Sequence, residues 1–285
     1  MTPLHATPPA AIALMLLAMA LIPAGDTAGK LLTDDLGAAP LFVAWSRFAL
    51  GAVLLVPFLR GAGLSPGLLV DWRIWLRGVL VVAAIVAMIT ALSTESLANV
   101  FGAFFVGPIL SYFLSALFLG ERIHRGQTLM LFLAFLGVLV VVRPGFGMSL
   151  GTGLGLLGGV FYGSFLVTSR WLSGVARPRA LLLSQLVIGA LVLAPFALPR
   201  LPEFSAPVLW LTLASALGSM LGNLALVFAY RHAPASRLAP LVYAQLLAAT
   251  AYGYAVFGDW PDAFTLLGLT VLMAAGAGSF LIRTR

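Results

Sequence analysis

The chain has 285 residues, of which 61% are hydrophobic and only 9% are charged. Soluble domains carry about a quarter charged residues, so this chain has too few charges to cover a water-facing surface. It contains no cysteine and three scattered histidines, which excludes disulfide frameworks, thiolate nucleophiles and cysteine-ligated zinc and argues against any metal or cofactor site.

Apolar windows of about twenty residues recur along the chain, each long enough to cross a hydrocarbon core of about 30 Å as a helix. They predict ten transmembrane spans, at residues 10–32, 40–59, 74–93, 97–119, 126–142, 151–171, 180–198, 207–230, 237–257 and 263–282. The first span contains an Ala-Met-Ala stretch at 18–20 that is typical of signal-peptide cleavage sites. No Lys or Arg precedes it, so we expect the span to remain uncleaved. The predicted fold class is an all-α integral membrane protein without a separate soluble domain.

Arginine is distributed unevenly between the connectors, and Lys and Arg gather in cytoplasmic loops. With the N-terminus inside, the inner connectors and the C-terminal tail hold Arg60, Arg73, Arg77, Arg122, Arg125, Arg170, Arg177, Arg179, Arg231, Arg237, Arg283 and Arg285. The outer connectors hold Arg143 and Arg200, together with Asp34, Asp35, Glu95, Glu203, Asp259 and Asp262. This asymmetry predicts a multi-pass protein of the cell inner membrane with both termini cytoplasmic. It also accounts for the net charge of +7 without a nucleic-acid partner.

A shift of 138 residues aligns the chain with itself. In the second span, Ser46, Gly51, Ala52, Leu55, Pro57 and Phe58 match Ser184, Gly189, Ala190, Leu193, Pro195 and Phe196 in the seventh. The same shift places Gly25 on Gly163, Trp72 on Trp210, Ala91 on Ala229 and Gly120 on Gly258. Each half, residues 1–148 and 149–285, holds five predicted spans, and this odd number turns the second half upside down relative to the first. The predicted architecture is two inverted five-helix repeats, a plan common among transporters.

Local motifs add a family resemblance to this plan. Asp26-Thr27-Ala28-Gly29-Lys30, Arg47 and Leu119-Gly120-Glu121-Arg122 resemble the EamA branch of the drug/metabolite transporter superfamily, and the likeness covers the whole chain. Phe257-Gly258-Asp259 is a weaker second copy of the third motif, and no role is carried over to its aspartate. The resemblance implies a central cavity lined by spans 1–4 and 6–9, with spans 5 and 10 peripheral. It also implies cargoes among amino acids, nucleosides, vitamins and drugs.

Three charged residues inside the predicted spans stand out: Asp26, Lys30 and Arg47. A charge at the membrane centre costs about 2.5–3.5 kcal/mol on insertion scales, so each needs a partner or a wet cavity. Asp26 and Arg47 lie at similar depths, about 9 and 10 Å from the outer ends of their helices. One interpretation has Arg47 binding an anionic group of the substrate while Asp26 holds Arg47 or takes a proton. The other is a buried pair that fixes helix packing, with Lys30 reaching the outer surface.

The repeat makes this region asymmetric, because the shift of 138 places Asp26, Lys30 and Arg47 on Ser164, Thr168 and Gln185. We therefore expect a charged outer vestibule and an uncharged polar inner one.

Further hydrogen-bonding side chains lie in the middle of predicted spans: Thr90, Ser111, Tyr112, Tyr162, Asn223, Tyr243, Gln245 and Thr250. The amides of Asn223 and Gln245 cannot face lipid cheaply, so we expect them to face the cavity or another helix. For the tyrosines, packing and pathway roles both remain open. Pro23 and Pro108 each remove a backbone hydrogen bond and predict kinks.

The sixth span contains a literal G-x-G-x-x-G at Gly153, Gly155 and Gly158. No strand precedes it and no acidic residue follows near twenty positions on, so we reject a nucleotide site. Gly155, Gly159 and Gly163 instead recur every four residues, which predicts a ridge for close helix packing.

We interpret the sequence as that of a secondary transporter that moves small polar or amphipathic metabolites, such as amino acids, by alternating access. Vitamins, nucleosides or drugs are alternative cargoes. A membrane-embedded enzyme would need a convergent set of titratable side chains, and the scarcity of histidine, cysteine and acids argues against it. A scaffold or channel is a third alternative. The expected partners are a small-molecule substrate, membrane lipid and a proton or other coupling ion, with the chain a monomer or homodimer.

Overall fold

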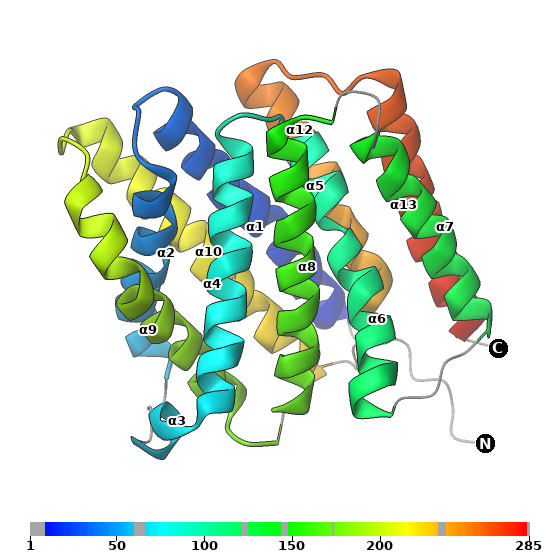
Figure 1. Ribbon diagram of the computed structural model, residues 1–285, viewed down its shortest axis with the longest axis horizontal. Helices are drawn as coiled ribbons and strands as arrows, with labels where there is room; N and C mark the ends of the chain where they lie inside the picture. Colours follow the sequence, from blue (N-terminus) through cyan, green and yellow to red (C-terminus); the bar gives the residue numbers. More distant parts are fainter. Residues whose placement is uncertain are drawn as a thin grey trace.

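The computed structural model describes residues 9–59, 66–120, 125–143, 148–172, 174–232 and 238–283. These ranges are helical and contain no strand (Figure 1). The helices are α1 (Pro9–Asp34), α2 (Pro40–Leu55), η1 (Val56–Phe58), α3 (Pro66–Val70), α4 (Trp72–Leu92), α5 (Leu97–Phe104), α6 (Val106–Leu119), α7 (Arg125–Val142), α8 (Leu150–Trp171), α9 (Pro178–Ala197), η2 (Leu198–Arg200), α10 (Ala206–His232), η3 (Ala239–Tyr243), α12 (Ala244–Phe257) and α13 (Ala263–Arg283). Glu121, Arg122 and His5 lie outside the described residues.

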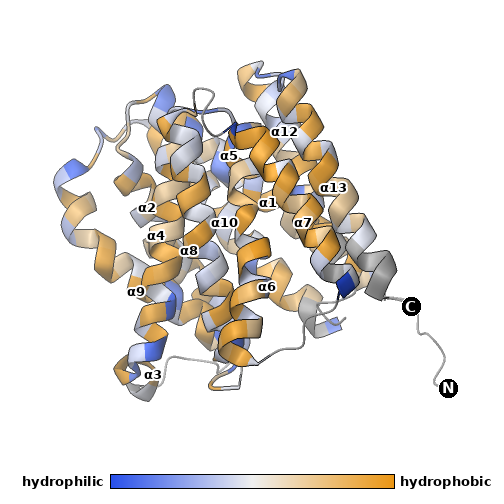
Figure 2. Ribbon diagram, turned by 45° about the vertical axis from the view of Figure 1, so that its right-hand side comes forward, coloured by the Kyte–Doolittle hydropathy of each residue, from blue (hydrophilic) through white to orange (hydrophobic). Residues whose placement is uncertain are grey.

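Each predicted span overlaps a helix of the described chain. Seven helical segments are long and apolar enough to cross a membrane: Pro9–Asp34, Pro40–Phe58, Trp72–Leu92, Leu97–Leu119, Leu150–Trp171, Pro178–Arg200 and Ala206–Ala229. The other three predicted spans contain shorter apolar helices, at Thr128–Val142, Leu241–Phe257 and Ala263–Gly278. Hydrophobic residues cover the lengths of the helices, while hydrophilic ones gather toward their ends (Figure 2).

The helix ends follow from local sequence. Pro40 and Pro178 each occupy the first turn of a helix, where the missing N–H costs nothing. Ser96 and Ser149 cap α5 and α8 by accepting a hydrogen bond from the backbone N–H three residues on. At the opposite ends of two helices, Gly120 and Gly258 adopt positive φ angles of 68° and 72°, which glycine reaches without a steric cost.

The helices pack as two bundles and a peripheral pair. In the first group, which we call bundle A, α1 packs on α10 and α12, and α2 packs on α10. In the second, bundle B, α4 packs on α8 and α9, while α5 and α6 pack on α8. Helices α2 and α9 join the bundles along one seam. The pair α7 and α13 lies at one edge of the molecule (Figure 1).

Small residues allow α8 to approach α5 and α6 closely. A Cβ atom at Gly159 would lie 2.5 Å from the carbonyl oxygen of Phe104, and one at Gly163 would lie 2.6 Å from that of Gly107. A Cβ at Gly155 would meet the carbonyl oxygen of Val100 at 3.3 Å. The predicted packing ridge is therefore confirmed.

The two prolines differ in their surroundings. The fourth span is interrupted at Phe105, between α5 and α6, and Pro108 is the third residue of α6. Helix α1 runs through Pro23 without interruption from Pro9 to Asp34. The Pro23 carbonyl accepts a hydrogen bond from the Thr27 hydroxyl at 2.8 Å.

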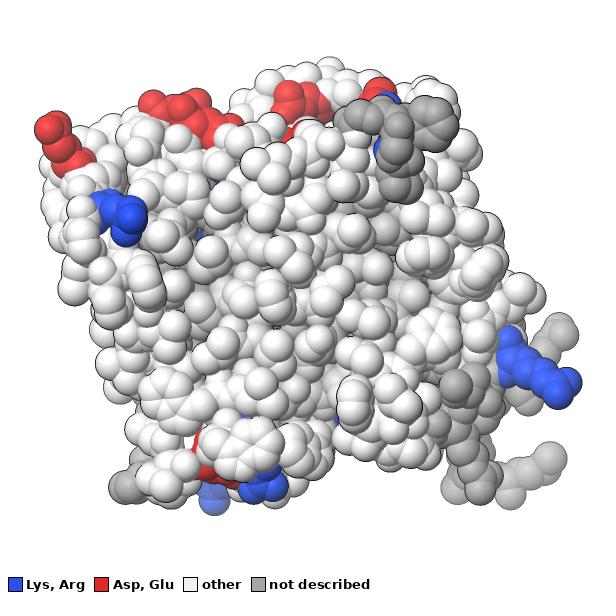
Figure 3. Space-filling model, in the orientation of Figure 1, with Lys and Arg blue, Asp and Glu red and all other residues white. Residues whose placement is uncertain are grey.

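Charges separate to the two ends of the bundle. Six described carboxylates, of Asp34, Asp35, Glu95, Glu203, Asp259 and Asp262, lie in or next to connectors at one end, which we call the acidic end, while Asp71 lies at the other end. Arg73, Arg125, Arg170, Arg177 and Arg179 belong to the other, the basic end. Figure 3 shows most of the visible acidic residues along the upper edge of the molecule, basic residues with one acidic residue at the lower edge, and a broad, largely uncharged band between.

Candidate functional site

A cavity of about 500 Å³ lies between bundles A and B. Both bundles contribute to its wall, which is largely apolar. Aromatic rings line much of it: Phe48, Phe104, Phe105, Tyr162 and Phe165. The polar lining consists of Asp26, Arg47, Arg77, Ser169, Gln185, Ser219, Asn223 and Gln245. This volume and this mixture of apolar surface with a few polar groups are typical of small-molecule sites.

The cavity extends to the basic end of the molecule. Its lining includes Pro178, the first residue of α9, and Ser169, near the last turn of α8. Toward the acidic end it stops earlier. On α1 the lining ends at Asp26, about 12 Å before the end of that helix at Asp34. The structure is therefore closed at the acidic end.

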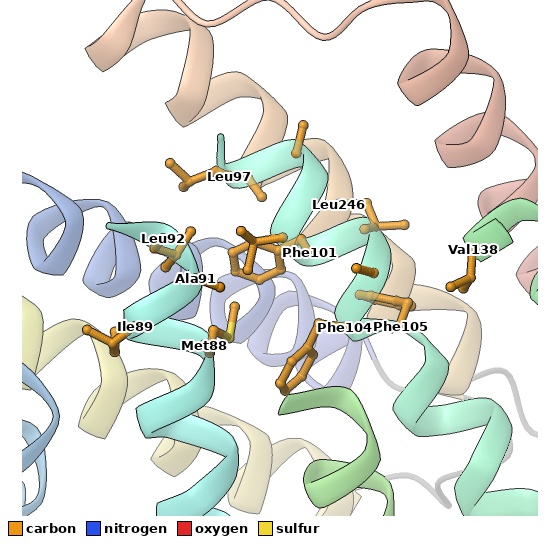
Figure 4. Close-up of a cluster of buried hydrophobic side chains, with 14 of the residues drawn as sticks. Met88, Ile89, Ala91, Leu92, Leu97, Phe101, Phe104, Phe105, Val138 and Leu246 are labelled. Atoms are coloured by element: carbon orange, nitrogen blue, oxygen red, sulfur yellow. The ribbon is translucent and has the colours of Figure 1, made fainter. Parts of the chain in front are cut away.

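Apolar side chains fill the space between the cavity and the acidic end. Leu92, Leu97, Phe101 and Leu246 belong to one buried cluster contributed by α4, α5 and α12 (Figure 4). Leu97 and Phe101 have no exposed surface. These buried side chains lie on the acidic-end side of the cavity.

Lys30 connects the bundles above this cluster. Its Nζ donates a 2.7 Å hydrogen bond to the carbonyl oxygen of Leu92, the last residue of α4, and pairs with Asp34 at 2.6 Å. The same Nζ lies 5.3 Å from the ring centroid of Phe257 on α12. Lys30 does not line the cavity; it ties α1 of bundle A to the end of α4 in bundle B.

A second polar link at the acidic end holds the peripheral pair. Arg143, after α7, forms an ion pair with Asp262, which precedes α13. Asp262 also accepts a hydrogen bond from the Thr265 backbone N–H at 2.8 Å and so caps α13. These donors, of which Arg143 is the strongest, lower the pKa of Asp262 to about 2 because they stabilise its charged form.

Arg47 binds three helices of bundle A together. Its Nη1 pairs with Asp26 of α1, its Nη2 donates to the Gly25 carbonyl at 2.6 Å, and its Nε donates to Ser215 of α10 at 2.7 Å. Ser215 also donates to the Gly25 carbonyl at 2.9 Å. Asp26 and Arg47 are 2% and 4% exposed. Each nitrogen of Arg47 has a protein acceptor, and its charge has a counter-ion.

Arg77 makes the corresponding links in bundle B, with neutral partners. Its Nε donates to Ser169 of α8 at 2.8 Å, its Nη1 to the Leu181 carbonyl at 2.9 Å, and its Nη2 to Gln185 Oε1 at 2.8 Å. Its guanidinium carbon lies 4.8 Å from the ring centroid of Phe165. Arg77 is 7% exposed and lines the cavity. It forms no ion pair with any described carboxylate.

The structure separates the residues predicted as a site into two groups. Asp26, Arg47, Tyr162, Gln185, Asn223 and Gln245 line the cavity, whereas Lys30, Tyr112 and Ser164 are not part of its wall. Tyr112 lies 3.3 Å, oxygen to oxygen, from Thr128 of α7. Ser164 donates to the Val160 carbonyl of its own helix at 3.0 Å. Asp26 and Arg47 form a buried ion pair, and Lys30 turns away from it toward Asp34, as in the second of the two interpretations.

Arg77 is the functional candidate that the sequence analysis missed. The arginine distribution assigned it to an inner connector, whereas the structure places it in the second turn of α4 with a buried side chain. The sequence feature that could have identified Arg77 is its position three residues inside the predicted span 74–93, where a charged side chain needs a partner. Ser215, the hydroxyl partner of Arg47, was missed because a serine carries no such signal. The described residues contain no cluster of metal-binding side chains.

The chain is a helical membrane protein with an internal cavity that is reached from one end and closed at the other. These features are typical of a transporter. The sequence model of the EamA-like transporter family matches residues 9–143 and again residues 149–282. The chain therefore belongs to the EamA-like transporter family, and it is a multi-pass membrane transporter, not an enzyme.

Named relatives agree with this assignment. The pseudopaline exporter CntI of Pseudomonas aeruginosa is 28% identical over 239 residues, covering 82% of this chain and 83% of its own. A riboflavin transporter of Rhizobium johnstonii is 24% identical over 252 residues, covering 86% and 82%. A crystal structure superposes with a TM-score of 0.65 over 95% of this chain and 96% of the other at 17% identity, a likeness that shows the fold alone.

Proposed function

We propose that the protein is a secondary transporter that moves small polar or amphipathic metabolites, such as amino acids or related compounds, across the inner membrane by alternating access. The observation that carries this proposal is the cavity between bundles A and B, which reaches the basic end and is closed toward the acidic end. The distribution of arginine supports a cytoplasmic basic end. We therefore propose that this conformation is inward-facing and that both termini are cytoplasmic.

The proposed architecture is a ten-helix inverted repeat. Two observations support it besides the double family match. The shift of 138 relates Arg47 to Gln185 and Arg77 to Ser215. Arg47 and Ser215 are hydrogen bonded to each other, and so are their counterparts Gln185 and Arg77. It also carries Phe105, where the fourth span breaks, onto Tyr243, where η3 meets α12, and these two rings lie 5.2 Å apart.

Rocking of bundle A against bundle B would open the cavity at the acidic end and close it at the basic end. The Lys30 link to Leu92 must break in that step, since it joins α1 to α4. The repeat counterpart of Lys30 is Thr168, whose hydroxyl donates within its own helix to the Ser164 carbonyl at 2.8 Å. Lys30 is thus proposed as a gating residue. Asp26 is proposed to hold Arg47, so that a coupling proton is not required at that position.

A second cargo class is favoured by the aromatic wall. Two relatives are named riboflavin transporters, from Rhizobium johnstonii and Vibrio cholerae. Phe104, Tyr162 and Phe165 form consecutive ring contacts at centroid distances of 5.0 and 5.8 Å. Such a surface suits a planar ring system of a vitamin or nucleoside.

Proteoliposomes containing the purified protein provide the test. We expect saturable counterflow of a radiolabelled cargo from a panel of amino acids, riboflavin and nucleosides. An Asn223→Trp variant, which fills the cavity, should abolish this flux. A Phe196→Trp variant is the matched control, because Phe196 is 54% exposed on the outside of α9. Flux that does not saturate, or that survives Asn223→Trp in a protein of unchanged thermal stability, would contradict the proposal.

A further inference from the structure

The cavity wall carries an uncompensated positive charge. Its charged lining residues are Asp26, Arg47 and Arg77. Asp26 neutralises Arg47 through their ion pair, so the described lining has a net charge of +1, located at Arg77. Burying a charge without a counter-ion is costly, and the structure retains this one beside a cavity.

Arg77 keeps hydrogen-bonding capacity for a ligand. A guanidinium has five N–H donors, and three of them bind Ser169, Leu181 and Gln185. One N–H therefore remains on each of the terminal nitrogens Nη1 and Nη2. Each of them can donate a charge-assisted hydrogen bond to an oxygen of a carboxylate or phosphate. The three existing bonds and the Phe165 ring hold the guanidinium in place before a ligand arrives.

Comparison with Arg47 shows what bundle B lacks. Both arginines bind three helices, and both have a hydroxyl partner, Ser215 for Arg47 and Ser169 for Arg77. Arg47 also has Asp26, whereas Arg77 pairs with no described carboxylate. Within the described part of the chain, bundle B therefore supplies no counter-ion for Arg77 where it borders the cavity.

We propose that the cargo supplies this counter-ion: Arg77 binds the carboxylate or phosphate group of an amphipathic anion, whose apolar part lies against Phe104, Tyr162 and Phe165. This inference rests on the proposed transport function and narrows its cargo to molecules with an anionic group. Arg47 is not the recognition residue, because Asp26 already occupies it.

Ligand-induced changes in thermal stability test the proposal on the full-length purified protein. The probes are 3-phenylpropionate, 3-phenylpropyl phosphate and the neutral 3-phenylpropionamide, which share an apolar group. We expect at least one anion to raise the unfolding midpoint of the wild type and the amide to have no effect. Arg77→Gln should weaken anion binding about tenfold or more, as loss of a charge-assisted hydrogen bond implies. Which anion stabilises the protein distinguishes carboxylate from phosphate.

Gln185→Glu is the decisive second variant, because it places a carboxylate where Gln185 now accepts from Arg77. We expect it to keep or raise the unfolding midpoint without ligand and to abolish anion binding. Arg73→Gln is the control, since Arg73 pairs with Asp71 at the surface outside the cavity. Undiminished anion binding by either Arg77→Gln or Gln185→Glu, an equal response to the amide, or no response to either anion would overturn the inference.

The flux experiment separates this inference from the proposed function. Saturable flux of a neutral or cationic cargo that is unaffected by Arg77→Gln would overturn the anion assignment and leave the transporter intact. Arg77-dependent anion binding without saturable flux of any cargo would support the site and contradict the transport function.

Discussion

Two buried arginines show how the same side chain can be used in different ways inside a membrane protein. Arg47 is satisfied entirely by protein groups, and its ion pair with Asp26 joins α1 to α2. Arg77 binds neutral acceptors and leaves its charge to the cavity. Removing one partner of a buried pair is more costly than removing both, because a single substitution leaves an uncompensated charge.

This argument predicts the effect of neutralising the Asp26–Arg47 pair. Asp26→Asn should destabilise the protein by about 3 kcal/mol or more, since it leaves Arg47 buried without a counter-ion. The double variant Asp26→Asn/Arg47→Gln should be more stable than Asp26→Asn alone. Thermal unfolding of the wild type, both single variants and the double variant in the same detergent measures the coupling. Additive losses of stability would show that the pair is not a structural unit.

At the level of the helices, glycine decides how closely α8 can approach its neighbours. The ridge of Gly155, Gly159 and Gly163 meets backbone atoms of α5 and α6, and α8 also packs on α4. Overpacking such a contact forces the backbone to move, at a cost of typically about 1–3 kcal/mol. A glycine on an open face of the same helix has no such neighbour.

Two alanine substitutions in α8 should therefore have opposite effects. Gly159→Ala places its Cβ 2.5 Å from the Phe104 carbonyl oxygen and should lower stability by about 1–3 kcal/mol. Gly153→Ala meets its nearest atom, in the side chain of Met148, at 3.6 Å and should be neutral or stabilising, since alanine favours helix by about 1 kcal/mol. Unfolding midpoints of the two variants give the comparison. Equal midpoints would contradict the role assigned to the ridge.

For the whole molecule, the closed acidic end depends on an apolar cluster and on one bridge between the bundles. Leu92 is the last residue of α4, so its carbonyl oxygen has no partner within the helix. Lys30 satisfies it from α1 and thereby favours the state that is open to the basic end. A hydrogen bond from a charged donor contributes about 1.5–3 kcal/mol.

Loss of this bridge should shift the protein toward opening at the acidic end. Because the chain contains no cysteine, a single Met88→Cys substitution can report access to the cavity from either side of the membrane. In Lys30→Met, labelling of this cysteine by an impermeant thiol reagent from the acidic side should rise about tenfold, the factor that corresponds to 1.4 kcal/mol. Lys30→Arg, which keeps a cationic donor, should label like the parent. Unchanged labelling in Lys30→Met would contradict the gating role.

The extent to which these features could be predicted from sequence depends on their physical origin. Apolar runs, glycine spacing and the charge asymmetry are local or periodic properties, and they led to the helices, the α8 ridge and the separation of charges. The pairing of Asp26 with Arg47 followed from their equal depth. The acceptors of Lys30 and Arg77 could not be predicted, because they lie far away in the chain, as the Leu92 carbonyl and Gln185 do.

The unpaired Arg77 has an electrical consequence for the proposed cycle. Moving one elementary charge through 100 mV is worth about 2.3 kcal/mol. A cavity loaded with a monoanion has no net charge, because the cargo cancels Arg77, whereas the empty cavity keeps its single positive charge. Membrane voltage would therefore act on the return of the unloaded carrier and leave the loaded step unaffected, so that the cell's potential sets how quickly the site is reset.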